Sequence, residues 1–214
     1  MKKACNTLIS SFISGILIAI GGVVFLACES KYLGAFAFSV GLFFTVEGGY
    51  KLYTGAIGYA LDNNKEDNLN LITIVIGNFL RTLFVGTILQ LTRLADSGIL
   101  LSLQAKAEAV SKVKLEDTWY SILVLSFMCG ILIYLGVDNF KKNANVFSKV
   151  WGIIICVFVF IVAGFEHCVA NMFYFVFSNS LDLHCVLYIL IMIFGNSLGG
   201  LLIPALKKVM NKLQ

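Results

Sequence analysis

Residues 164–173 have the sequence Gly164-Phe165-Glu166-His167-Cys168-Val169-Ala170-Asn171-Met172-Phe173. They lie inside an apolar run, residues 150–177, in which Glu166 is the only charged residue. An ionised carboxylate at the centre of a membrane helix costs about 2.5 kcal/mol or more, and such residues generally face a cavity or a transport path rather than lipid. The stretch therefore predicts a functional site within a membrane.

The composition also indicates an integral membrane protein. Of the 214 residues, 59% are hydrophobic and 13% are charged, and the mean hydropathy is +0.90. A soluble domain of this length cannot bury so much apolar surface. The first apolar run, residues 8–27, can span a bilayer and has no small-residue cleavage site behind it, so we expect no cleaved signal peptide. The basic residues lie mainly between apolar runs, so no nucleic-acid partner is expected.

Hydropathy predicts six membrane spans, at about 8–28, 33–61, 70–93, 118–138, 150–177 and 184–206. The second and fifth are longer than the roughly 20 residues that one crossing needs. Small and polar residues interrupt each of these two midway, at 47–55 and 164–171. Non-helical backbone is tolerated at that depth only where protein or a water-lined cavity satisfies it. Both spans are therefore predicted to be helices broken inside the membrane.

The two interruptions correspond to each other along the chain. An offset of 115 residues pairs Leu52 with His167, and an offset of 118 pairs Asn78 with Asn196. We therefore predict an all-α membrane protein with six transmembrane helices in an inverted three-plus-three repeat, like that of aquaporins, in which paired broken helices mark the binding site. The predicted parts of this single domain, 1–214, are repeat one (about 1–100), an amphipathic linker helix (about 102–114) and repeat two (about 115–214).

Basic residues predict the orientation of the chain. With the N-terminus inside, nine Lys and Arg residues fall on inner segments and five on outer segments, while Lys51 and Arg81 lie within spans. Basic residues favour the cytoplasmic side. We therefore expect a multi-pass protein of the cell membrane with both termini in the cytoplasm.

The cysteine and histidine residues predict no disulfide framework, metal site or cofactor. The six cysteines form no CxxC pair and lie mostly in apolar runs, as small buried hydrophobic residues do. His167-Cys168 and His184-Cys185 are adjacent pairs and lack the spacing of metal ligands. Paired carboxylates and a nucleophile constellation are also missing from the sequence, so we do not expect an enzyme.

The motif at 164–173 resembles the signature of the formate/nitrite transporter family, the pentameric channels for small monovalent anions. The resemblance extends from the second span to the end of the sixth. It implies a channel for formate, nitrite or hydrosulfide, a homopentamer, and one pore per subunit.

The resemblance also implies which residues line the pore. Residues 49–54 resemble the family's first interrupted loop, which implies that the Thr54 hydroxyl meets His167. Further implied positions are the constrictions at Phe38, Leu42, Phe160 and Ala170, an inner-slit aromatic at Tyr53, an anion-attracting lysine at Lys114 and a loop-holding asparagine at Asn196. Four residues of the interrupted segments complete the predicted pore and substrate-binding set: Leu52, Lys51, Glu166 and Asn171.

The chemistry of the broken helices agrees with an anion site. Each half-helix that restarts after a break directs its N-terminal N–H groups toward the membrane centre, which suits an anion or a polarised weak acid. Burial disfavours the imidazolium, so we expect His167 to be neutral at pH 7 and to donate from one nitrogen. Whether His167 transfers a proton or only donates a hydrogen bond is left open by the sequence.

Two charged residues depart from the family pattern. Lys51 replaces the acidic residue that the family usually has in its first loop, and Arg81 stands where the family has a glycine. Buried charges in membranes generally compensate one another. We therefore expect Lys51 to pair with Glu47 or Glu166, in a network that includes Arg81.

The working hypothesis is a channel, passive or proton-coupled, that passes a small anion as its neutral acid between apolar constrictions. A neutral-solute pore shares the six-span plan, but the paired Asn-Pro-Ala loops of aquaporins are absent from the sequence, and Pro204 is its only proline. The stronger alternative is a structural or sensory membrane protein of the same fold that has lost anion transport. Lys51, Arg81 and the short segment between the fifth and sixth spans favour this alternative.

Overall fold

The computed structural model describes residues 2–95 and 102–213, and the regular elements among them are helices. In chain order they are α1 (Lys2–Ala27), α2 (Lys31–Glu47), α3 (Tyr53–Ala56), the 3-10 helix η1 (Ile57–Tyr59), α4 (Lys65–Gln90), α5 (Leu103–Leu115), α6 (Trp119–Lys142), α7 (Val146–Ala163), α8 (Cys168–Phe177) and α9 (Leu183–Leu213). The prediction of an all-α protein is confirmed.

Five of the described helices, α1, α4, α6, α7 and α9, are long and apolar enough to cross a membrane, and α8 is a shorter apolar helix. The second and fifth predicted spans each contain more than one helix. Residues 33–61 hold most of α2 together with α3 and η1, and residues 150–177 hold most of α7 together with α8. The interruptions predicted at these two places are present.

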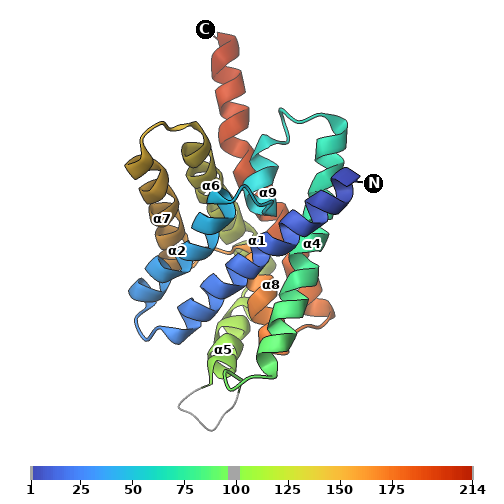
Figure 1. Cartoon of the computed structure of the whole chain (residues 1–214), viewed down its shortest axis with the longest axis vertical. Coiled ribbons are helices and arrows are strands. Elements are labelled where there is room, and N and C mark those ends of the chain that lie inside the picture. The colour runs from blue at the N-terminus through green and yellow to red at the C-terminus, as the bar shows by residue number, and fades with distance from the viewer. Residues whose placement is uncertain (1, 96–101, 214) are drawn as a thin grey trace.

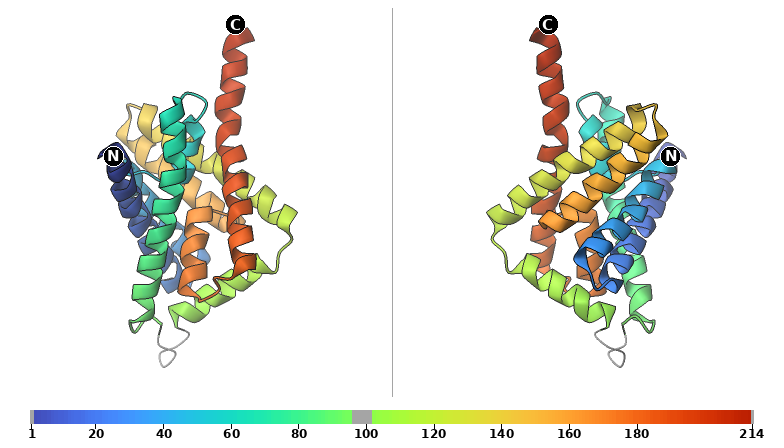
Figure 2. Two further views of the ribbon diagram at one scale, coloured as in Figure 1. Left: turned by 90° about the vertical axis from the view of Figure 1, so that its right-hand side faces the viewer. Right: turned by 90° about the vertical axis from the view of Figure 1, so that its left-hand side faces the viewer.

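The long helices surround α8, which lies near the centre of the molecule (Figure 1). α6 packs against α9 and α7, while α1 packs against α2 and α4. Both termini lie toward one end of the molecule and α5 lies at the other (Figure 2). All ten residues of α8 are buried, whereas each of the long helices exposes large apolar side chains. A helix that is apolar on every side belongs in an interior, so α8 forms the core to which the other helices pack.

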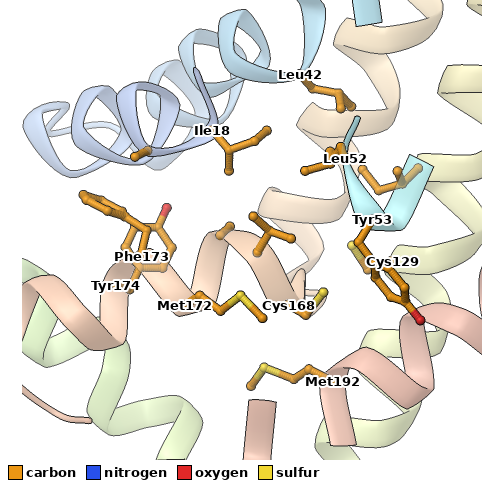
Figure 3. Close-up of a cluster of buried hydrophobic side chains, with 14 of the residues drawn as sticks. Ile18, Leu42, Leu52, Tyr53, Cys129, Cys168, Met172, Phe173, Tyr174 and Met192 are labelled. Atoms are coloured by element: carbon orange, nitrogen blue, oxygen red, sulfur yellow. The ribbon is translucent and has the colours of Figure 1, made fainter. Parts of the chain in front are cut away.

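The side chains around α8 belong to several helices (Figure 3). Met172 and Phe173 of α8 share one buried cluster with Ile18 of α1, Leu42 of α2 and Met192 of α9. Apolar burial of this kind holds both helix breaks in the interior, because each break directly precedes a helix that is in the cluster.

A glycine in the left-handed region marks each break. Gly49 has φ 68° and Gly164 has φ 75°, and side chains with a Cβ rarely adopt such angles. Gly164 ends α7 with its N–H bonded to carbonyls of the last turn, an arrangement common at helix ends. The two glycines therefore let the chain leave helical geometry and restart in a new direction.

The predicted linker helix is α5, which begins after Ser102. The Ser102 hydroxyl accepts the Ala105 N–H at 3.1 Å, which caps the first turn. Nearer the C-terminal end of the helix, the hydroxyl oxygens of Ser111 and Ser178 lie 3.0 Å apart and join α5 to the end of α8. The predicted boundary between repeat one and this linker, near residue 100, lies outside the described residues.

Candidate functional site

The second break positions His167 at the start of α8. His167 is the N-cap of this helix, and its Nδ1 accepts the Ala170 backbone N–H at 3.1 Å. Upstream, the Phe165 N–H donates to the Phe160 carbonyl at 2.8 Å, which closes the turn after α7. The imidazole is therefore fixed by the backbone of its own helix.

His167 and Thr54 meet between the two breaks. The Nε2 atom of His167 lies 2.8 Å from Oγ1 of Thr54, and both residues are buried. Because Nδ1 already accepts from Ala170, we assign the proton of the neutral ring to Nε2, which then donates to Thr54. The Thr54 hydroxyl keeps its own hydrogen to donate. Protonating Nδ1 would break the cap of α8, so the cap is consistent with this Nε2–H tautomer.

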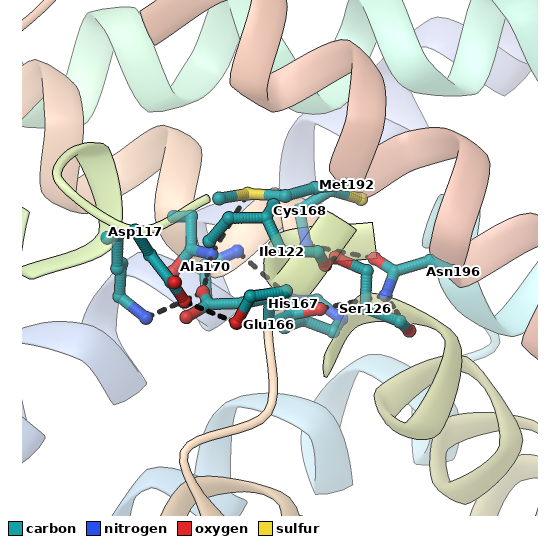
Figure 4. A network of polar contacts seen from close by, with 12 residues as sticks. Asp117, Ile122, Ser126, Glu166, His167, Cys168, Ala170, Met192 and Asn196 are labelled. Atoms are coloured by element: carbon teal, nitrogen blue, oxygen red, sulfur yellow. Dashed lines mark hydrogen bonds and ion pairs between the residues drawn. The ribbon is translucent and has the colours of Figure 1, made fainter. Parts of the chain in front are cut away.

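Asn196 of α9 ties the second break to two other elements (Figure 4). Its Oδ1 accepts the Cys168 N–H at 2.9 Å, and its Nδ2 donates to the Glu166 carbonyl at 2.8 Å and to the Ser126 carbonyl at 2.7 Å. The bonds to Cys168 and Glu166 satisfy the backbone on both sides of His167, and the bond to Ser126 anchors the amide to α6. The amide therefore holds the interrupted segment in place.

Asn78 of α4 does the same at the first break. Its Oδ1 accepts the Tyr53 N–H at 3.0 Å, while its Nδ2 donates to the Ser11 carbonyl at 2.9 Å and lies 3.4 Å from the Lys51 carbonyl. The backbone on both sides of Leu52 is thus bonded to one buried amide. The offset of 118 residues that pairs Asn78 with Asn196 in the sequence indicates this equivalence.

The prediction that Lys51 pairs with Glu47 or Glu166 is wrong. Glu166 accepts from Lys114 Nζ at 2.6 Å and from the Asn171 amide. Lys51 instead donates to Thr7 Oγ1 at 3.0 Å, and none of the ion pairs among the described residues includes Lys51 or Glu47. The lysine nearest to Glu166 comes from α5, an element that sequence spacing could not orient.

Arg81 also stands apart from the predicted charge network. Its side chain is fully buried, and it donates to the carbonyls of Ser11, Phe12 and Asn78. Its guanidinium carbon lies 5.6 Å from the centroid of the Phe12 ring. Among the described residues its compensation comes from carbonyl dipoles and an aromatic face rather than from a carboxylate. A Cβ at Gly15 would overlap the guanidinium, so the missing side chain there makes the space that Arg81 fills.

An aromatic stack continues from the imidazole. Phe160 stacks on His167 with ring centroids 5.7 Å apart, and Phe38 meets Phe160 edge-on at 6.1 Å. All three side chains are buried. The rings of Phe38 and Phe160 therefore place an apolar surface directly against the imidazole of His167.

Two cavities are lined by most of the predicted pore residues. The α5-side cavity, of about 380 Å³, is lined by Phe38, Phe160, His167, Ala170, Lys114, Glu166 and Asn171. The termini-side cavity, of about 420 Å³, is lined by Leu42, Leu52, Lys51, Asn70, Tyr59 and Lys141 among others. Tyr53, next to Thr54, places its hydroxyl 2.7 Å from Ser197 Oγ. Ten of the thirteen predicted residues thus line one of the two cavities, and Thr54, Tyr53 and Asn196 are buried residues outside both linings.

Sequence reasoning missed Asn70 and Lys141 of the termini-side cavity. Asn70 lies in the first turns of α4, in a polar segment that looks like a loop boundary. Lys141 precedes Lys142 at the end of α6, where paired lysines look like an ordinary cytoplasmic signal. Among the described residues, no group of three or more His, Cys, Asp and Glu side chains is placed to hold a metal ion.

The fold and the paired helix breaks define a multi-pass membrane protein of a transporter type. The chain belongs to the formate/nitrite transporter family, whose sequence model matches residues 1–210. Members of this family are channels and transporters rather than enzymes.

Relatives and a solved structure agree with this assignment. The chain is 28% identical over 154 residues to the formate channel FocA of Haemophilus influenzae, a match that covers 67% of this chain and 52% of FocA. It is 28% identical over 200 residues to a probable formate transporter of Methanothermobacter thermautotrophicus, covering 79% of this chain and 73% of that protein. The chain thus spans about half the length of FocA. A structure titled "Pentameric formate channel with formate bound" superposes with a TM-score of 0.85 and 24% identity, covering 100% of this chain and 99% of the other, which shows a shared fold.

Proposed function

We propose that this chain is a channel for a small monovalent anion, or its conjugate weak acid, of the formate, nitrite or hydrosulfide type. The observation that carries the proposal is the 2.8 Å contact of His167 with Thr54, where two interrupted helical segments meet. The names of FocA and of the Methanothermobacter relative, and the formate bound in the similar structure, support formate as the first substrate to test.

The architecture that we propose is an inverted repeat of three plus three crossings within a single domain, 1–214. α2 with α3 would form the second crossing and α7 with α8 the fifth. The equivalent roles of Asn78 and Asn196 support this pairing, because each amide binds the backbone on both sides of a break. Repeat one is about 1–100 and repeat two about 115–214, with the linker between them.

In the proposed permeation step, the substrate crosses the apolar passage as the neutral acid rather than as the ion. The anion enters the α5-side cavity, whose lining includes the Lys114–Glu166 pair, and takes a proton from hydronium there, releasing water, before it enters the apolar passage. Moving an ion past Phe38, Phe160, Leu42 and Leu52 would cost its hydration, whereas the neutral acid loses much less. The Thr54 hydroxyl, oriented by Nε2–H of His167, donates to the acid during passage.

Other predicted residues have supporting roles in this scheme. Tyr53 and Ala170 would shape the constrictions, Asn171 would hold Glu166 against Lys114, and Asn196 would hold the segment that carries His167. Lys51 would add a positive charge on the termini side. The imidazole acts as a hydrogen-bond donor in this proposal, because its Nδ1 is occupied by the α8 cap.

We further propose a homopentamer in the cell membrane with both termini in the cytoplasm. The pentameric state of the similar formate channel supports the first point. The excess of lysine and arginine on the segments next to the termini supports the second. The termini-side cavity would then face the cytoplasm.

Reconstitution in proteoliposomes tests the proposal. Formate, nitrite and hydrosulfide should each cross faster than in protein-free vesicles, with urea as a neutral solute that does not. Equal rates with and without folded protein for all three anions would favour a non-transporting membrane protein of the same fold, the alternative suggested by Arg81 and Lys51. Rapid urea flux would favour a neutral-solute pore.

A further inference from the structure

Hydrogen-bond donors gather in the termini-side cavity. Lys51 and Lys141 both line it. Lys51 Nζ donates one hydrogen bond to Thr7 Oγ1 at 3.0 Å, and Lys141 Nζ lies 4.1 Å from the centroid of the Tyr59 ring. Within residues 2–95 and 102–213, neither ammonium group lies within 4.0 Å of a carboxylate oxygen. Two lysines therefore line the same cavity, and neither is paired with a carboxylate among the described residues.

The two acidic residues in the lining of this cavity, Asp62 and Asp67, already have partners. Asp62 lies 2.7 Å from Lys208 Nζ, and Asp67 lies 3.0 Å from Lys3 Nζ. Both pairs are on the solvent side, at the end of the molecule where the termini lie. The carboxylates are thus drawn toward lysines of α9 and α1, which leaves the ammonium groups of Lys51 and Lys141 less compensated.

An unsatisfied amide lines the same cavity. The Nδ2 atom of Asn70 is buried and has no hydrogen-bond partner among the described residues. A buried donor without an acceptor costs free energy, so native structures generally provide it with a partner or a ligand. Asn70 is independent of the lysines, since it belongs to α4 and they belong to the first break and to α6.

We propose that the termini-side cavity is an anion-binding site for a small carboxylate, held by Lys51, Lys141 and the Asn70 amide. The two ammonium groups and the Nδ2 group of Asn70 are all donors, and donors are what the oxygen acceptors of an anion require. The cavity of about 420 Å³ has room for roughly a dozen water molecules at ~30 Å³ each, so a one- to three-carbon carboxylate fits with part of its hydration.

The site is distinct from the His167–Thr54 pair. His167 lines the other cavity, and the apolar side chains of Leu42 and Leu52 lie among the lining of this one. The site does not depend on permeation, because binding from the termini side needs no passage through the pore. In a channel it would hold the anion at that mouth and make flux from that side saturate at lower concentration.

Binding can be measured directly on the purified full chain in detergent. The probe is ¹³C-labelled sodium formate, followed by the broadening of its NMR line as protein is added. The Lys51→Gln/Lys141→Gln double variant should bind formate about tenfold or more weakly, as loss of charge-assisted hydrogen bonds predicts. Lys212→Gln, an exposed lysine near the end of α9, is the matched control and should bind like the wild type. Unchanged affinity in the double variant would overturn the proposal.

Three further binding measurements keep the result interpretable. Asn70→Asp has the same size but places a carboxylate at the donor position, and it should abolish formate broadening in protein that elutes as a single symmetric species. Formamide, neutral and similar in size, should not bind, and equal binding of formamide and formate would contradict an anion site. In His167→Phe the broadening should persist, and its loss would assign the bound formate to the central pair. Absence of flux with retained binding would refute the channel function and leave this site standing.

Discussion

Asn78 and Asn196 make equivalent hydrogen bonds at the two helix breaks. Each Oδ1 accepts the N–H of the first residue of the helix that restarts, at 3.0 Å in one case and 2.9 Å in the other. Each Nδ2 also donates to a serine carbonyl, that of Ser11 or that of Ser126. These two serines are 115 residues apart, the same offset that relates the breaks themselves. The same arrangement of asparagine hydrogen bonds therefore holds the break in each half of the chain.

Asn196→Ala should lower the stability of the protein substantially. The substitution leaves the Cys168 N–H and the carbonyls of Glu166 and Ser126 buried without this partner, and each unsatisfied buried group costs about 1–3 kcal/mol. The thermal unfolding midpoint in detergent measures the effect. Asn211→Ala, at an exposed position of α9, serves as the control and should leave the midpoint unchanged. Equal midpoints for the two variants would contradict a holding role for Asn196.

Thr54→Val should reduce formate flux by about tenfold or more. The substitution keeps the shape of the side chain but removes the acceptor of His167 Nε2–H and the donor offered to the acid. Loss of about 1.4 kcal/mol of transition-state stabilisation corresponds to a tenfold change in rate. Thr54→Ser retains the hydroxyl and should retain most of the flux. Proteoliposome flux at matched protein density provides the comparison, and similar rates for the two variants would exclude a role for the hydroxyl.

His167→Asn should lower formate flux without changing the shape of its pH profile. The imidazole caps α8 through Nδ1 and donates through Nε2, so in the proposed scheme it orients the Thr54 hydroxyl and transfers no proton. Flux should rise as pH falls in both proteins, because the neutral fraction of the permeating acid increases. Flux measured at several pH values tests this. A profile that flattens in His167→Asn would instead assign proton transfer to the imidazole.

Lys114→Met should destabilise the protein more than the double variant Lys114→Met/Glu166→Gln. The side chains of Lys114 and Glu166 are only 14% and 5% exposed, and removal of one partner from a buried ion pair costs about 3–5 kcal/mol. In the double variant, no uncompensated charge remains and the Asn171 amide still has an acceptor. Unfolding midpoints of the wild type, Lys114→Met, Glu166→Gln and the double variant give the coupling. A double variant that is less stable than Lys114→Met would rule out this pairing as the cause.

The sequence predicted the helical membrane architecture and both breaks because those features leave local signals. Gly49 and Gly164 interrupt apolar runs, and the pairing of Asn78 with Asn196 follows from a simple offset. The partners of the charged side chains could not be predicted from the sequence. Lys114 reaches Glu166 across the α5–α8 packing, and Lys51 turns to Thr7 of α1, which lies 44 residues away. Such partners depend on how helices are oriented, and periodicity does not encode that.

Arg81 and Gly15 give the last prediction. Gly15→Ala adds a Cβ that would overlap the guanidinium of Arg81, which is buried and bonded to carbonyls of α1 and α4. Overpacking of this kind typically costs about 1–3 kcal/mol. The same substitution in an Arg81→Gly background meets no guanidinium and should cost much less. Unfolding midpoints of the four proteins measure the coupling, and additive effects would show that the side chain of Arg81 moves aside freely.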